Sequence, residues 1–158
     1  MYSTDYSSPI GEMLIVSDGE AICGVWFYGQ KHFPKFKEII KDDNLAIFKD
    51  VKQWFDEYFK GLNPKINFKL KPQGTDFRLK VWKILTEIPY GETRTYGQIA
   101  RMISPKMSAQ AVGGAVGHNP IAIIIPCHRV LGSDGKLTGY AGGIDKKIEL
   151  LKVEDIRI

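Results

Sequence analysis

The sequence predicts an α+β fold: a small N-terminal antiparallel sheet with a packed helix, followed by a mostly helical, winged-helix-like domain that contains a helix-turn-helix. Three observations support this prediction. Apolar runs broken by short turns fill residues 2–27, apolar residues recur at helical spacing over residues 47–59, and further helical patterns follow residue 74. Because Lys69 to Gly74 is typical of a boundary, we expect domains at residues 1–73 and 74–158.

Turn residues separate the expected strands of the first domain. A Ser8-Pro9 turn follows the alternating residues at the start of the chain, and Asp18-Gly19 separates two apolar runs, which is typical of a hairpin. The expected helix ends before Gly61, and its apolar face consists of Ile47, Phe48, Val51, Trp54, Phe55, Tyr58 and Phe59. We find no catalytic pattern in this domain. Cys23 is predicted to be a core residue and His32 a solvated loop residue.

Three helices are expected in the first half of the second domain. An apolar stripe between Thr75 and Pro89 predicts the first, and Thr95 with Gln98 forms a capping box for the second. The third begins at Ser108, a favourable N-cap, and runs from Ala109 to about Gly117. The tight turn between the last two is typical of a helix-turn-helix. A final helix is expected to turn Ile148 and Leu151 inward.

The third helix is rich in glycine. Gly113, Gly114 and Gly117 each cost roughly 1 kcal/mol relative to alanine in a helix. Such glycines permit the close approach of a ligand, or close packing against a neighbouring helix, and the sequence favours neither. The helix also lacks the charged and amide residues that usually read base edges, apart from Gln110, so sequence-specific recognition in the major groove is not expected.

The charge of the chain is unevenly distributed. Residues 1–73 hold ten lysines and ten acidic residues, whereas residues 74–158 hold twelve lysines and arginines against eight acids, which accounts for the net charge of +4. This excess is compatible with a nucleic-acid partner. No apolar run approaches the roughly 20 residues that span a bilayer, and two cysteines form no disulfide framework or zinc pattern. We therefore expect a soluble, cytoplasmic protein.

A cysteine and a histidine follow the apolar run Ile121 to Ile125, in the sequence Pro126-Cys127-His128-Arg129-Val130. We interpret this segment as a nucleophile at the end of a strand, held in place by the rigid turn at Pro126. Only a thiolate is strongly nucleophilic, so a neighbour must accept the proton of Cys127, and His128 is the first candidate. Taken alone, a buried cysteine beside a surface histidine explains the pair equally well.

The second domain resembles the alkylguanine-DNA alkyltransferases, also called methylated-DNA-protein-cysteine methyltransferases, over essentially all of residues 74–154. The resemblance rests on five motifs in the family's order and spacing, of which Pro126 to Val130 is highly specific. The motifs are Tyr96-Gly97-Gln98-Ile99-Ala100, Ala111-Val112-Gly113-Gly114-Ala115, Asn119-Pro120, Ile125-Pro126-Cys127-His128-Arg129-Val130 and Tyr140-Ala141-Gly142-Gly143.

The resemblance implies a catalytic group of four residues. Cys127 accepts the alkyl group, Glu154 orients His128 in a chain of Glu, His, water and Cys, and Tyr96 supplies its hydroxyl to guanine N3. The substrate-binding residues implied are Val130, Tyr140, Ala141 and Asn119. Lys147 lies near these positions, although a solvated helix face explains it equally well. Because a thioether has no low-barrier route back to a thiol, each molecule is expected to act once, without cofactor or metal.

The resemblance implies that the partner is double-stranded DNA that contains alkylated guanine. We expect the protein to bind this DNA as a monomer, with no membrane involved. The helix-turn-helix would enter the minor groove and flip the modified base into a pocket beside Cys127. The DNA-binding residues implied are Thr95, Ser108, Gln110, Ala111, Gly113, Gly114 and Arg129. Gln110 departs from the family, which often has an arginine there that fills the space left by the flipped base.

Two other functions are considered. A module that binds alkylated DNA without repairing it would lack the reactive cysteine, and Cys127 argues against it. A Cys-His hydrolase would need turnover through an acyl intermediate and an oxyanion hole, and it leaves the helix-turn-helix unexplained.

Overall fold

The N-terminal half is built on a five-stranded sheet with the strand order β4-β1-β2-β3-β5. The computed structural model describes residues 1–157, and its strands are β1 Tyr2–Ser8, β2 Gly11–Ser17, β3 Ala21–Phe27, β4 Ile40–Lys41 and β5 Lys69–Leu70. The central strands β1, β2 and β3 are antiparallel, as predicted, and the turn between β2 and β3 contains Asp18-Gly19. The two short edge strands pair in parallel with β1 and β3.

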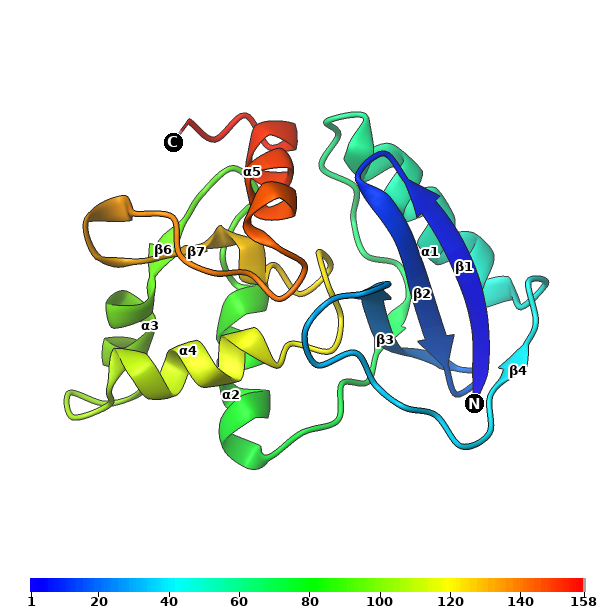
Figure 1. Cartoon of the computed structure of the whole chain (residues 1–158), viewed down its shortest axis with the longest axis horizontal. Coiled ribbons are helices and arrows are strands. Elements are labelled where there is room, and N and C mark those ends of the chain that lie inside the picture. Colours follow the sequence, from blue (N-terminus) through cyan, green and yellow to red (C-terminus); the bar gives the residue numbers. More distant parts are fainter. Residues whose placement is uncertain (158) are drawn as a thin grey trace.

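Helix α1, Ala46–Phe59, covers one face of this sheet, as Figure 1 shows. Its apolar face is that predicted from the spacing, with Phe48, Val51 and Phe55 fully buried. The ring of Phe55 stacks on Tyr6 of β1, with the ring centroids 5.2 Å apart. The helix ends at Lys60, and Gly61 follows with a φ of 81°. Tyr58, in the last turn, is buried and points toward the C-terminal half.

The other face of the sheet is covered by the loop after β3. Leu14, Val16 and Trp26 form a second small cluster there, against which Phe33, Phe36 and Ile39 pack. The Trp26 ring lies across Gly24, where an added Cβ would come within 2.0 Å of it, so only glycine fits at this position. In Figure 1 the same loop leaves the end of β3 and reaches toward the C-terminal half.

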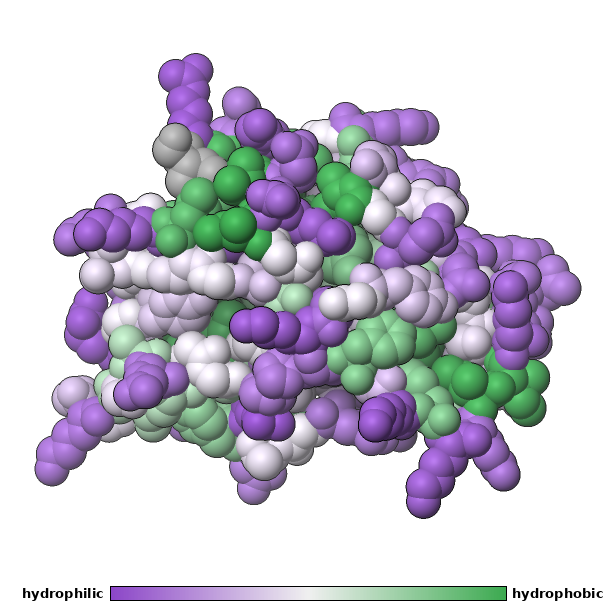
Figure 2. All heavy atoms as spheres, in the orientation of Figure 1, coloured by the Kyte–Doolittle hydropathy of each residue, from purple (hydrophilic) through white to green (hydrophobic). Residues whose placement is uncertain are grey.

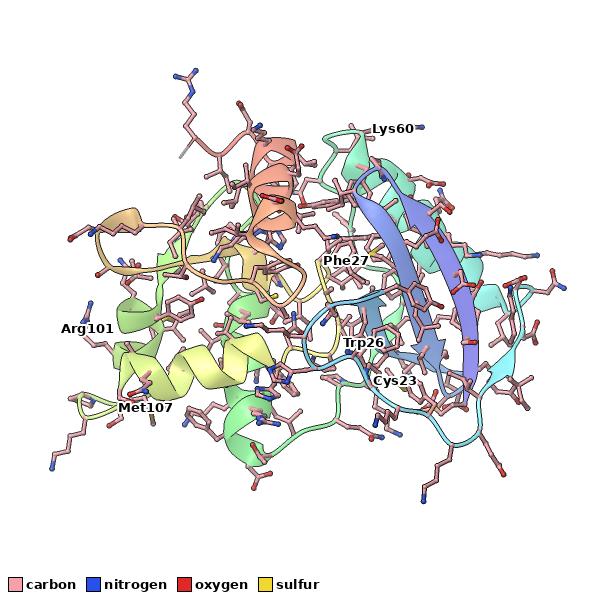
Figure 3. The ribbon with its side chains drawn as sticks, in the orientation of Figure 1. Cys23, Trp26, Phe27, Lys60, Arg101 and Met107 are labelled. Carbon is pink, nitrogen blue, oxygen red and sulfur yellow. The ribbon has the colours of Figure 1, made fainter. Side chains whose placement is uncertain are left out.

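The C-terminal half contains four helices and two small parallel strands. The elements are α2 Asp76–Thr86, β6 Arg94–Thr95, α3 Tyr96–Ile103, α4 Ala109–Gly117, β7 Val130–Leu131 and α5 Ile144–Val153. The predicted N-caps are confirmed at Thr75, Thr95 and Ser108, and the Thr95-Gln98 capping box is complete. Figure 3 shows Arg101 and Met107 beside α3 and α4, on the side away from Cys23 and Trp26 of β3.

A single core joins the two halves. It runs from Ile15 of the sheet through Phe55 of α1 and Trp82 of α2 to Leu150 of α5. The backbone of Val25 in β3 also bonds to the second half, because its N–H donates to Pro120 O at 2.8 Å and its carbonyl accepts from the N–H of Ala122. Within residues 1–157, no helix combines the length and the apolar character needed to cross a membrane.

Candidate active site

The segment that delivers Cys127 is a series of tight turns, so the prediction of a strand over Ile121 to Ile125 is wrong. Only Ile121 makes a bridge to the sheet, and Ile123 has a φ of 70°. The Asn119 side chain holds these turns: its oxygen accepts from the N–H of Ile121, and its amide donates to Ile125 O at 2.8 Å. Side-chain bonds from Asn119 therefore replace the strand ladder that a buried apolar run would otherwise require.

Cys127 is the first residue of a short 3-10 helix, η1 Cys127–Arg129, and is 7% exposed. Burial raises the pKa of its thiol, while Asn119, Lys147 and Tyr140 act in the opposite direction. The thiol is therefore protonated in the resting protein, and Cys127 needs a group that accepts its proton when it reacts.

Glu154 lies 3% exposed beside His128, which is fully buried. Its Oε2 accepts from His128 Nε2 at 2.5 Å and from the Tyr58 hydroxyl at 2.6 Å. Its Oε1 accepts from Arg129 Nε at 2.7 Å and from the N–H of Gly91 at 3.1 Å. Four donors from three segments of the chain therefore hold the Glu154 carboxylate in the interior.

These contacts determine the protonation states of Glu154 and His128. Burial alone would raise the pKa of Glu154, but the hydrogen bonds from His128, Arg129 and Tyr58 lower it to about 2. Burial lowers the pKa of His128, against the opposing effect of Glu154. An ionised Glu154 can only accept, so Nε2 of the neutral imidazole carries the hydrogen and Nδ1 carries the lone pair. Nδ1 has no hydrogen-bond partner among the described residues, and it is the nitrogen able to accept a proton.

The Arg129 side chain is bonded within the protein. Its side chain is 11% exposed, bonded to Glu154 and donating from Nη1 to Ile88 O at 2.8 Å. Its guanidinium also lies over the Tyr90 ring, 5.7 Å from the centroid. The charge of Arg129 therefore compensates the buried carboxylate of Glu154, and its role in DNA binding stays a prediction.

Lys147 of α5 is fully buried, so the alternative of a solvated helix face is wrong. Its ammonium donates to Val130 O at 2.6 Å. Burial lowers the pKa of Lys147 to about 8, and Cys127 acts in the opposite direction. Lys147 thus places a cation close enough to the Cys127 thiol to favour its ionisation.

A pocket of about 370 Å³ opens above Cys127. Tyr96 of α3 forms one wall, and its hydroxyl accepts from Thr138 at 3.2 Å. Burial raises the pKa of Tyr96, so it remains a phenol able to donate. Tyr140 and Ala141, from the loop before α5, form another wall, and burial raises the pKa of Tyr140.

The glycines of α4 also line this pocket. An added Cβ would meet nothing within 4 Å at Gly114 or Gly117, and at Gly113 only the Tyr96 ring at 3.8 Å. Close packing against a neighbouring helix therefore does not explain Gly114 and Gly117, whereas Gly113 faces the Tyr96 ring of α3. The glycines keep the space between α4 and the mouth of the pocket open.

The remaining residues predicted to bind DNA lie on the outer side of α3 and α4. Ser108, Gln110, Ala111 and Gly114 are exposed, whereas Thr95 and Gly113 are partly exposed. The hydroxyls of Thr95 and Ser108 cap their helices. Figure 2 shows a pale, weakly polar surface over α4, with the strongly hydrophilic side chains projecting around it.

Sequence reasoning missed the place of four residues at the site. Tyr58 was assigned only to the apolar face of α1, because a tyrosine at helical spacing gives no sign of a polar partner 96 residues away. Lys31 and His118 line the pocket, and so does His32, which was predicted only as a loop residue. His32 stacks on His118, with the ring centroids 3.9 Å apart. The adjacency of His118 to Asn119 was the one available signal.

The chain matches two family models that together cover nearly all of it. Residues 1–72 match the ribonuclease-like domain of 6-O-methylguanine DNA methyltransferase, and residues 76–156 match its DNA binding domain.

Relatives and solved structures agree with these matches. The chain is 47% identical to a methylated-DNA--protein-cysteine methyltransferase of Haemophilus influenzae over 99% of this chain and 87% of that protein. It is 48% identical to a protein of the same name from Methanosarcina barkeri, over 98% of each. The crystal structure of Mycobacterium tuberculosis OGT in complex with DNA superimposes with a TM-score of 0.91 and 42% identity, covering 98% of this chain and 92% of that one. The chain therefore belongs to the 6-O-methylguanine DNA methyltransferase family.

Proposed function

We propose that this protein repairs DNA by transferring an alkyl group from O6 of guanine to its own Cys127, once per molecule. The observation that carries the proposal is the buried pair of His128 and Glu154 behind Cys127, at the base of an open pocket. The curated relatives bear the name of this reaction, and the family models cover both halves of the chain.

The proton of the thiol passes to Nδ1 of His128 in this mechanism, through a water molecule as the resemblance implies. Glu154 accepts from Nε2 and stabilises the imidazolium that forms. Lys147 stabilises the thiolate from the other side. Because burial keeps the resting thiol protonated, this transfer coincides with the arrival of substrate.

The thiolate of Cys127 then attacks the alkyl carbon. A sulfur–carbon bond forms, the carbon–oxygen bond to O6 breaks, and the electron pair remains on the guanine. Tyr96 donates a hydrogen bond or a proton to guanine N3, which compensates the developing negative charge. The product is a stable thioether, so the protein is consumed and no cofactor takes part.

Double-stranded DNA approaches through α3 and α4, and the modified base turns out of the stack into the pocket. Exposed Gln110 lies in the first turn of α4, beside the proposed minor groove. The carbonyls of Cys127 and Val130 and the N–H of Ala141 recognise the guanine edge. Val130 O already accepts from Lys147, and its second lone pair is available to the base.

Intact-protein mass measurement after incubation with a duplex containing O6-methylguanine tests this function. We expect a permanent gain of one methyl group in the unaltered protein and in Cys23→Ser, and none in Cys127→Ser, which still binds DNA. Cys23 is the matched control because it is the second buried thiol. Uptake that follows Cys23, or turnover on an ester or peptide, would contradict the proposal.

A further inference from the structure

The loop after β3 brings the N-terminal half to the mouth of the pocket. The N–H of Lys31 donates to Ala141 O at 3.1 Å, which ties this loop to the loop before α5. His32 adopts a φ of 60°, an uncommon conformation for a residue other than glycine. Phe33 and Phe36 anchor the same loop on Trp26 of the sheet. The position of Lys31 and His32 is therefore fixed from both sides.

His118 meets His32 from the other half of the molecule. It directly follows α4, and its Nδ1 lies 2.8 Å from Gly114 O, to which it donates. The two imidazoles stack with an interplanar angle of 28°. Since the Gly114 carbonyl engages Nδ1, Nε2 is the ring nitrogen of His118 that can contact a bound anion.

The charged groups that act on His32 are all basic. Desolvation lowers the pKa of His32, and His118 at the end of α4, Lys31 on the same loop and Arg78 on α2 act in the same direction. Positive groups that face one another repel, and a bound anion relieves this repulsion. By contrast, α4 itself, AQAVGGAVG, carries no charged residue along the edge of the pocket.

We propose that Lys31, His32 and His118 form a phosphate clamp at the mouth of the pocket, which holds the DNA backbone beside the flipped nucleotide. The inference rests on the proposed function. A nucleotide inside the pocket remains joined to its strand by two phosphodiesters, which must lie at the mouth. The uncharged α4 approaches the groove closely, and the clamp supplies the cations that the helix lacks. The N-terminal half thereby contributes directly to DNA binding.

The clamp predicts a link between DNA affinity and pH. A phosphate beside the His32 imidazole favours its protonated form, so the complex binds more protons than the free protein. Affinity for the duplex therefore rises as the pH falls from about 8 to about 6, the range in which histidine titrates. Lys31 contributes to the salt dependence of binding.

The test measures binding of a duplex containing O6-methylguanine to the full chain with Cys127→Ser, which prevents the reaction. The slope of log K against log salt is measured at about pH 6 and about pH 8. The proteins compared are Cys127→Ser alone and Cys127→Ser combined with Lys31→Met, His32→Gln or His118→Gln. Lys35→Met is the matched control, because Lys35 is exposed on the same loop but does not line the pocket.

We expect Lys31→Met to reduce the slope of log K against log salt by about 0.9, as for one lost phosphate contact. His32→Gln is expected to remove most of the gain in affinity at the lower pH, His118→Gln to weaken duplex binding, and Lys35→Met to change none of these quantities. Wild-type slopes and wild-type pH dependence in the three clamp variants would overturn the proposal. His32 is exposed, so its variant remains informative even if His118→Gln fails to fold.

A second assay separates the clamp from the proposed function. With Cys127 intact, methyl uptake from the free base O6-methylguanine involves no phosphate, so we expect the Lys31, His32 and His118 variants to slow uptake from the duplex more than uptake from the free base. Failure of the unaltered protein to take up methyl from either substrate would contradict the proposed function. Normal uptake with unchanged duplex binding in every clamp variant would contradict the clamp alone.

Discussion

The Tyr58 hydroxyl donates a 2.6 Å hydrogen bond to Oε2 of Glu154, the oxygen that also accepts from His128. Tyr58 belongs to α1 of the N-terminal half, and its oxygen lies 3.3 Å from His128 Nε2. Burial and the neighbouring Glu154 raise the pKa of Tyr58, so it remains a donor at every pH relevant to function. Tyr58 therefore weakens the electrostatic stabilisation that the Glu154 carboxylate gives to the charged form of His128.

Tyr58→Phe is expected to move the pH dependence of transfer. Without this donor Glu154 becomes more basic and stabilises the His128 imidazolium more strongly. The pKa of His128 then rises, because its charged form gains a stronger partner. Because His128 must be neutral to accept a proton, the acid limb of the rate profile shifts to higher pH. Tyr6→Phe is the control, since Tyr6 bonds to Asp56 outside the site. An acid limb that stays in place would remove Tyr58 from this role.

Lys147→Met is predicted to slow methyl transfer without lowering the thermal stability of the protein. Its lowered pKa means that the folded protein holds the charged form of Lys147 less well than the unfolded chain does. This charge therefore opposes folding below about pH 8, and the opposition is relieved as pH rises toward the ordinary lysine value. Methionine fills similar space without charge. We expect thermal stability at neutral pH to be retained or raised, while methyl transfer becomes about tenfold slower, equivalent to about 1.4 kcal/mol. A transfer rate equal to wild type would exclude an electrostatic role for Lys147.

Glu154→Gln is expected to destabilise the protein as well as slow transfer. Arg129 would remain buried without its carboxylate, which costs roughly 3–5 kcal/mol. The folded-state pKa of Glu154 is lowered to about 2, so its contribution is present above the unfolded value near 4.5 and is lost as the pH falls toward 2. Chemical denaturation across this range should show wild type and variant converging at low pH. A constant difference between them would contradict the assignment of an ionised Glu154.

Gln110→Arg is expected to strengthen duplex binding. An arginine in the first turn of α4 adds a cation to a groove of strongly negative potential. The slope of log K against log salt should steepen by about 0.9, and methyl transfer from the duplex should become faster. Transfer from the free base should hardly change, because it involves no flipping. Identical slopes and duplex rates for wild type, Gln110→Arg and Gln110→Ala would mean that Gln110 does not face DNA.

Locally encoded features of the fold were predictable from sequence. The Asp18-Gly19 hairpin and the Thr95-Gln98 capping box depend on residues only a few positions apart. The conformation of the segment Ile121 to Ile125 could not be predicted, because a buried apolar run has the same composition in a strand and in a turn. The hydrogen bonds of the Asn119 side chain decide between the two.

Only the site residues that lie within a recognisable motif could be predicted from the sequence. The motifs indicated Cys127 and His128, but the position of a buried charge depends on partners far away in the chain. Arg129 and Lys147 illustrate this: Glu154 and Val130 O, which hold them inside, lie on other segments of the chain. For the same reason no local pattern marked Tyr58 as a neighbour of Glu154.

The most direct test of single-use transfer to Cys127 is a titration of the protein with excess methylated duplex. The methyl groups lost from DNA and the methyl groups gained by the Cys127 peptide are both counted. We predict that both reach a plateau at one per protein molecule and that the DNA guanine is restored. Loss of methyl groups beyond this plateau, or label on a peptide other than that of Cys127, would contradict the account.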